Sequence, residues 1–230
     1  MWLLHSSVGK KSVMSITGIA LVLFLLFHLS MNVAAVFSAD AYNAICAFLG
    51  ANWYAVGGTI LLGFLVFIHC AYATMLTLQN RKARGNDRYA VNKRPKGVGW
   101  ASQNMFVLGL VVCGFLLLHF WQFWRKMMFA ELVGHHEVML GGQMVSPQDG
   151  HAFICYYFSQ LWVVIAYLAW YVALWFHLTH GFWSAFQSIG LNNHIWFNRW
   201  KWIGNIVATA MMLGFVFVTL FFYIQSTINN

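Results

Sequence analysis

Residues 15–28 read SITGIALVLFLLFH, and this stretch decides the fold. It belongs to an apolar run long enough to cross a bilayer, which takes about 20 residues of helix. A polar group inside hydrocarbon is costly, so a histidine there is by default a hypothesis for a functional site. The first four apolar stretches of the chain each carry one such histidine: His28, His69, His119 and His177.

The composition of the whole chain indicates a membrane protein. Of its 230 residues, 61% are hydrophobic and 8% are charged, whereas a soluble domain has about 25% charged residues. The net charge of +8 does not indicate a nucleic-acid partner, because the basic residues lie in short segments beside apolar runs. We therefore expect a lipid bilayer around the chain and no nucleic acid.

Five apolar spans can be drawn, and each must be helical because a bilayer holds no water to satisfy the backbone. Their predicted bounds are about 13–37, 54–79, 103–124, 157–185 and 202–226. The first span is longer than the roughly 7–15-residue core of a signal peptide, so we expect it to be retained. The predicted fold is an all-α membrane protein, with one five-transmembrane-helix bundle domain over residues 1–230.

The distribution of lysine and arginine predicts the orientation, since cytoplasmic loops carry an excess of both. Eleven of the 13 lie on one predicted side: Lys10, Lys11, Arg81, Lys82, Arg84, Arg88, Lys93, Arg94, Lys96, Arg199 and Lys201. Only Arg125 and Lys126 fall on the other. We therefore expect a cytoplasmic N-terminus and an external C-terminus.

The positions of the four histidines along their spans predict two pairs at two depths. His28 and His119 lie toward the outer ends of spans that run outward. His69 and His177 lie toward the inner ends of spans that run inward. A helix rises about 1.5 Å per residue, which separates the two levels by very roughly 10–15 Å. Two imidazoles facing each other across a bundle can supply both axial positions of a haem iron, so the pattern indicates two stacked haems.

These residues also allow other interpretations. A single buried histidine is more simply an interhelical hydrogen-bond partner, but four at matched depths favour haem ligation. Spacing alone does not decide between His177 and His180, which share one helix face. The four cysteines form no C-x-x-C pair and no C-x-x-C-H motif, which argues against zinc and against covalently attached haem.

At these residues the chain resembles the two-haem, single-anchor cytochrome b subunit of succinate dehydrogenase and quinol:fumarate reductase. The resemblance covers nearly the whole chain and rests on residues 14–18 (MSITG), His28, Asn32, His69, His119 and residues 176–184 (FHLTHGFWS). It implies that His177 rather than His180 is the fourth axial ligand. It also implies that His69 pairs with His177 and His28 with His119.

The resemblance implies a function in respiratory complex II. The chain would be a metal-binding membrane anchor in the bacterial inner (cytoplasmic) membrane, with an iron–sulfur subunit and a flavoprotein subunit on its cytoplasmic side. Two b-type haems would pass electrons between the iron–sulfur subunit and menaquinone near the outer haem. The chain would contribute the quinone site of the enzyme complex and not the dicarboxylate site. Some relatives carry a glutamate two residues before the fourth ligand for proton transfer, but Trp175 stands here.

Polarity and depth suggest further contacts. Ser15 is a candidate partner for a propionate of the inner haem, Arg125 for the outer one, and His180 is a further candidate haem contact. Asn32 and Trp121 are candidates for the border of the quinone pocket.

Two predicted loops are less informative. The basic loop at residues 81–100 is interpreted as a solvated loop that can also dock a soluble partner. The external loop, about 126–156, holds Glu131, His135, His136, Glu137, Asp149 and His151. Their spacing matches no strong metal motif, so a surface loop is favoured over a lid on the quinone site and over a metal site.

Two alternative functions are kept. One is the diheme cytochrome b subunit of another quinone-linked complex, of the hydrogenase or formate dehydrogenase type. The other is a small transporter with a histidine proton relay, which should show inverted repeats that the sequence lacks.

Overall fold

The computed structural model describes residues 6–84, 99–191 and 193–228. Within these ranges, five helices are long and apolar enough to cross a membrane: Ser7–Phe37, Trp53–Ala83, Met105–Trp124, Leu161–Ser188 and Trp196–Ile228. The expectation of an all-α protein with five membrane-spanning helices is confirmed at this level. Part of the basic loop, including Arg88, Lys93, Arg94 and Lys96, lies outside the described residues.

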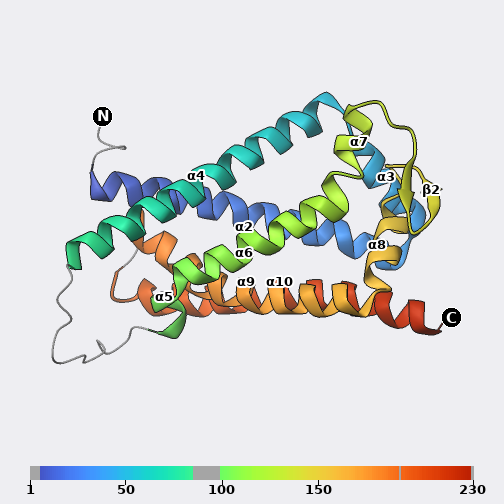
Figure 1. Ribbon diagram of the computed structural model, residues 1–230. Helices are drawn as coiled ribbons and strands as arrows, with labels where there is room; N and C mark the ends of the chain where they lie inside the picture. Colours follow the sequence, from blue (N-terminus) through green and yellow to red (C-terminus); the bar gives the residue numbers. More distant parts are fainter. Residues whose placement is uncertain (1–5, 85–98, 192, 229–230) are drawn as a thin grey trace.

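The long helices run along the molecule, and all the short elements except α5 gather at one end of it (Figure 1). The long ones are α2 (Ser7–Phe37), α4 (Trp53–Arg84), α6 (Met105–His119) with its π-helical extension η1 (Phe120–Trp124), α9 (Leu161–Ser188) and α10 (Trp196–Ile228). The short ones are α3 (Ala39–Phe48), α5 (Trp100–Gln103), α7 (Met128–Leu132), β1 (Val138–Leu140), β2 (Gln143–Val145) and α8 (Gly150–Phe158).

Serine and aspartate caps begin several of these helices. The Ser6 hydroxyl accepts a hydrogen bond from the Gly9 amide at 2.9 Å and starts α2. Ser38 has extended backbone angles that end α2, and its hydroxyl accepts from the Ala41 amide to start α3. Asp149 caps α8 in the same way. Such caps satisfy amides that have no partner inside the helix.

Some predicted bounds were wrong by more than a turn. The first and fifth spans begin at Ser7 and Trp196, six residues before the predicted starts. Hydropathy falls where lysine and arginine appear, but the helix continues because charged side chains can reach water at a membrane surface. The predicted fourth span starts inside α8, whereas α9 begins at Leu161 after a break at residues 159–160.

α9 is the central helix of the bundle. It packs against α10, α2 and α6, whereas α4 packs mainly against α2. The best-buried large side chains belong to α8, α9 and α10: Phe153, Ile154, Val163, Met211 and Phe222. Many large apolar side chains elsewhere are exposed, such as Trp53 at 86% and Phe67 at 69%. An exposed apolar surface of this extent suits a lipid environment.

The two ends of the bundle differ in character. At the end where α2 and α10 begin, here named the basic end, lie Lys10, Lys11, Arg81, Lys82, Arg84, Arg199 and Lys201. The opposite end, here named the cap end, carries α3, α7, the β1–β2 hairpin and α8 (Figure 1). The described basic residues therefore segregate as expected, with Arg125 and Lys126 at the cap end.

The predicted external loop is an ordered cap rather than an irregular surface loop. Asn43 of α3 donates to Asp149 at 2.8 Å and accepts from the His151 amide at 2.9 Å. Glu131 of α7 accepts from the Ala51 amide at 3.0 Å and from the Gln148 side chain at 2.5 Å. These bonds tie together segments that hydropathy alone leaves as separate loops. Three further residues of the predicted external loop are exposed: His135, His136 and Glu137.

Candidate functional site

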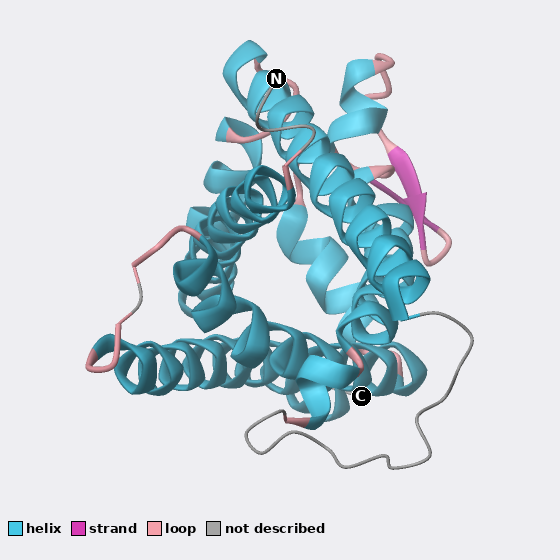
Figure 2. Ribbon diagram, turned by 90° about the vertical axis from the view of Figure 1, so that its left-hand side faces the viewer, coloured by secondary structure: helices cyan, strands magenta, loops and turns pink. Residues whose placement is uncertain are grey.

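The helices of the bundle line a partly open cavity of about 1570 Å³. Its lining comes from all five long helices and, at the cap end, from α3, α7 and α8. Figure 2 views the bundle from the basic end, with the long helices arranged around the centre. A pocket for one small ligand usually measures about 300–1,000 Å³, so this cavity has room for more than one group.

All four histidines line this cavity, and they do so in two pairs. At the cap end, the rings of His28 on α2 and His119 on α6 have centres 5.8 Å apart and lie nearly perpendicular, at 88°. At the basic end, the rings of His69 on α4 and His177 on α9 have centres 6.4 Å apart, at 63°. The pairing predicted from depth is therefore confirmed, whereas a ligand role for these residues stays a prediction.

The ring spacing can be compared with that of a metal held between two imidazoles. An imidazole nitrogen binds a metal at about 2 Å and lies roughly 1.2 Å from its own ring centre. Two rings on opposite faces of one iron are then about 6 Å apart. Both pairs match that value, at 5.8 Å and 6.4 Å. The donor set and its spacing therefore fit a bis-histidine haem at each level.

Small residues surround the basic-end pair. A Cβ at Gly18 would lie 3.4 Å from Cε1 of His69, and a Cβ at Gly109 would lie 3.6 Å from Cε1 of His177. A Cβ would therefore just reach van der Waals contact with the imidazole, and any larger side chain at these positions would press on it. The buried Thr17 adds a hydrogen bond, since its Oγ1 lies 3.1 Å from Nδ1 of His69.

Aromatic rings surround the cap-end pair. Phe24 stacks on His28 with ring centres 5.5 Å apart, and Phe123 and Trp170 contact His119. Tyr167 also contacts His119, with its hydroxyl 3.1 Å from Nδ1. That hydroxyl donates to Oε1 of Gln122 at 2.9 Å.

The wide turn η1 directly after His119 positions Gln122. Its mark is the bond from the Arg125 amide to the Phe120 carbonyl at 2.9 Å, which spans five residues instead of four. This turn leaves Gln122 buried, at 3% exposed, while Trp121 is 61% exposed. Single π-turns inside helices occur frequently at functional sites. No feature of the sequence predicted this turn.

The structure brings some predicted contact residues to the cavity and leaves others outside. Ser15, Asn32 and His180 line it. Arg125 and Trp121 stack on each other 4.0 Å apart, and neither is among the described lining residues. A propionate role for Arg125 and a quinone role for Trp121 stay predictions, which the lining of this cavity does not support.

Ring contacts also separate His177 from His180. His177 faces His69, whereas His180 packs edge-on against Trp183 with centres 5.0 Å apart. Within the described residues, His180 makes no ring contact with another histidine. This geometry favours His177 as the partner of His69.

Tyr42 had no predicted role, and Asn32 was predicted only as a border of the quinone pocket. Asn32 links His28 to Tyr42, whose hydroxyl donates to Oδ1 of Asn32 at 3.2 Å. Burial raises the pKa of Tyr42, so its hydroxyl stays protonated and able to donate. Among the described lining residues, the only Lys, Arg, Asp or Glu side chains are Lys11 at the basic end and Glu131 at the cap end. Only packing shows which polar residues face the cavity.

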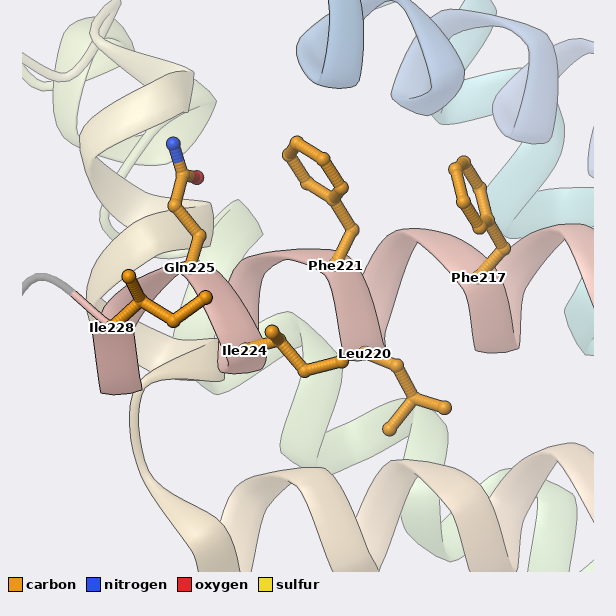
Figure 3. Close-up of a pocket in the computed structure, with 6 residues that line it drawn as sticks. All are labelled: Phe217, Leu220, Phe221, Ile224, Gln225 and Ile228. Atoms are coloured by element: carbon orange, nitrogen blue, oxygen red, sulfur yellow. The ribbon is translucent and has the colours of Figure 1, made fainter.

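Other possible sites in the described part of the chain are weaker. A second hollow, of about 530 Å³, lies on α10 and is lined by Phe217, Leu220, Phe221, Ile224, Gln225 and Ile228 (Figure 3). It contains no titratable side chain. No group of three or more His, Cys, Asp or Glu residues suits a metal ion within the described ranges. That finding does not test a haem, which needs only two protein ligands.

Fold and cavity define a class: a multi-pass helical bundle with two histidine pairs on one internal cavity. Comparisons with protein families, with curated proteins and with solved structures find no match for the chain.

Proposed function

We propose that this chain is the membrane-anchor diheme cytochrome b subunit of a succinate:quinone oxidoreductase. The observation that supports it best is that one cavity is lined by two pairs of imidazoles. The ring centres are 5.8 Å apart within one pair and 6.4 Å apart within the other. When bound, haem b supplies reversible one-electron storage between ferric and ferrous iron. The chain's own part is to hold the axial imidazoles, exclude water and shape an apolar channel through the bilayer.

Each end of the cavity has polar side chains that would contact a bound group. At the basic end, Lys11 and the buried Ser15 lie one helical turn apart and both line the cavity, where a haem carboxylate can pair with the ammonium group. At the cap end, Asn32 and Glu131 are polar groups on the cavity wall and are candidates to border menaquinone.

The basic end would be the cytoplasmic side, where an iron–sulfur subunit and a flavoprotein subunit dock. The concentration of lysine and arginine there supports this orientation, because cytoplasmic segments carry an excess of both. The dicarboxylate reaction would take place on the partner subunits. This chain would pass electrons between the iron–sulfur subunit and the quinone in either direction.

Haem content and succinate-driven reduction test the proposal. The purified complex is expected to give a b-type reduced-minus-oxidised spectrum with two haems per chain. His119→Ala should remove one haem, whereas His136→Ala, in the exposed cap, should keep both. A correctly folded, haem-free preparation from a haem-replete cell would overturn the haem assignment. Haems that hydrogen or formate reduces but succinate does not would instead indicate another quinone-linked complex.

A further inference from the structure

In each histidine pair, one imidazole is held by a buried hydroxyl from another helix and the other is not. The held rings are His69, through Thr17, and His119, through Tyr167. In both cases the hydroxyl oxygen lies 3.1 Å from Nδ1 of the ring. A hydroxyl has only one proton, so the destination of that proton decides which group donates in each contact.

The Thr17 proton is used within its own helix. Oγ1 of Thr17 donates to the backbone carbonyls of Val13 at 2.9 Å and Met14 at 3.0 Å. With the proton on either carbonyl, the Oγ1 lone pair is free to accept, and Nδ1 of His69 would carry the proton that is donated. Nδ1–H of His69 leaves Nε2 with a free lone pair.

The Tyr167 proton is used in the same way. Its hydroxyl donates to Oε1 of the buried Gln122 at 2.9 Å, so its lone pair accepts from Nδ1–H of His119. Gln122 reaches Tyr167 because of the wide turn η1. The π-turn after His119 thus carries the group that takes the Tyr167 proton.

The other ring of each pair lacks such support. Nδ1 of His177 is buried and has no hydrogen-bond partner among the described residues. Nε2 of His28 faces the amide nitrogen of Asn32 at 3.4 Å, a long contact. The hydroxyl of Tyr42 holds Oδ1 of Asn32 and so orients this amide toward His28.

We propose that Thr17 and Tyr167 are positioning residues that fix His69 and His119 in the Nδ1–H tautomer. Each pair then consists of one preset ligand, whose Nε2 is ready for iron, and one adaptable ligand that reorients on binding. The proposal rests on haem binding by these pairs, as proposed above. Partners that hold the second ring nitrogen of a metal-binding histidine fix its orientation and raise its basicity.

The tautomers can be measured without haem. Nitrogen NMR of ¹⁵N-histidine-labelled full-length chain, prepared haem-free in detergent, should show Nδ1–H for His69 and His119. Thr17→Val should change the His69 signal alone, and Tyr167→Phe the His119 signal alone, while Thr17→Ser keeps the wild-type signal. Thr219→Val and Tyr171→Phe are matched controls, because they remove a buried hydroxyl pair that lies 2.9 Å apart on α10 and α9.

Haem binding gives the second readout. Thr17→Val and Tyr167→Phe should each weaken the affinity of one site for added haem b about 10- to 100-fold and shift the low-spin electron paramagnetic resonance signal of that site only. Nε2–H at His69 or His119 in the unmodified chain overturns the inference, even if the variants fail to fold. Unchanged affinity at both sites in folded variants also overturns it. Correct tautomers in a chain that never binds haem would instead overturn the proposed function.

Discussion

The two histidine pairs have the same spacing but opposite surroundings. Large aromatic rings and a buried hydrogen-bond network enclose His28 and His119 at the cap end. Glycines lie against His69 and His177 at the basic end. A protein can therefore hold two similar imidazole pairs either by filling the space around them or by letting the backbones approach.

The helices behind the two pairs also differ. His69 is carried by α4, which packs mainly on α2. None of the residues in the most apolar stretch of α4 is buried. His119 is carried by α6, which packs along the central helix α9. Because packing supplies most of the stability of a helix in a protein, we expect the basic-end pair to be the more easily disturbed.

The largest expected effect comes from removing one member of the basic-end pair. His177→Ala should reduce the haem content from two per chain to one, because a single imidazole remains at that level. His180→Ala, three residues away, should keep both haems, since His180 packs on Trp183 instead. Haem per chain is measured from the pyridine haemochrome spectrum. The reverse outcome would show that the assignment within the FHLTHG stretch is wrong.

A smaller effect is expected from filling the close approach at the basic end. Gly18→Val adds a side chain where even a Cβ lies 3.4 Å from His69, and such overpacking costs about 1–3 kcal/mol. The basic-end haem should bind more weakly while the cap-end haem is unchanged, as measured by haem titration. Gly58→Val is the matched control, because a Cβ there meets no described atom within 4 Å. Equal effects of the two variants would remove the contrast between the two ends.

The cap end should respond to a change in its own hydrogen bonds. Asp149→Ala removes the N-cap of α8 and the partner of Asn43, which should lower stability by about 1 kcal/mol. Thermal unfolding in detergent measures this loss. Glu137→Ala, in the exposed part of the cap, should leave the unfolding temperature unchanged. An unchanged unfolding temperature of Asp149→Ala would show that this contact does not stabilise the packing of α3 on α8.

The smallest perturbation tests the contact between α4 and α6. Sγ of Cys70 lies 3.5 Å from Sγ of Cys113, and a disulfide needs about 2.05 Å. A mild copper oxidant should therefore cross-link the two residues, as detected by mass spectrometry of non-reduced peptides, and Cys113→Ser should prevent it. Absence of the Cys70–Cys113 product would mean that α4 lies farther from α6.

The features that could be predicted from the sequence are those that depend only on position along a single helix. Hydropathy located five spans, and a fixed rise per residue placed His28 level with His119 and His69 level with His177. Neither the spans nor these levels depend on how each helix is rotated about its own axis. The same holds for the basic residues, which gather at the helix ends that the span directions imply.

The tertiary structure decided the rotation of each helix and the identity of each neighbour. Arg125 and Trp121 have suitable depths but do not line the cavity, whereas Thr17 contacts His69 and Tyr167 contacts His119. The π-turn after His119 and the cap built from α3 and α8 also leave no local pattern in the sequence. Depth depends on position along one helix, but the direction in which a side chain points depends on contacts with the others. The sequence by itself therefore determined the spans and the levels of the four histidines, and packing decided which residues surround them.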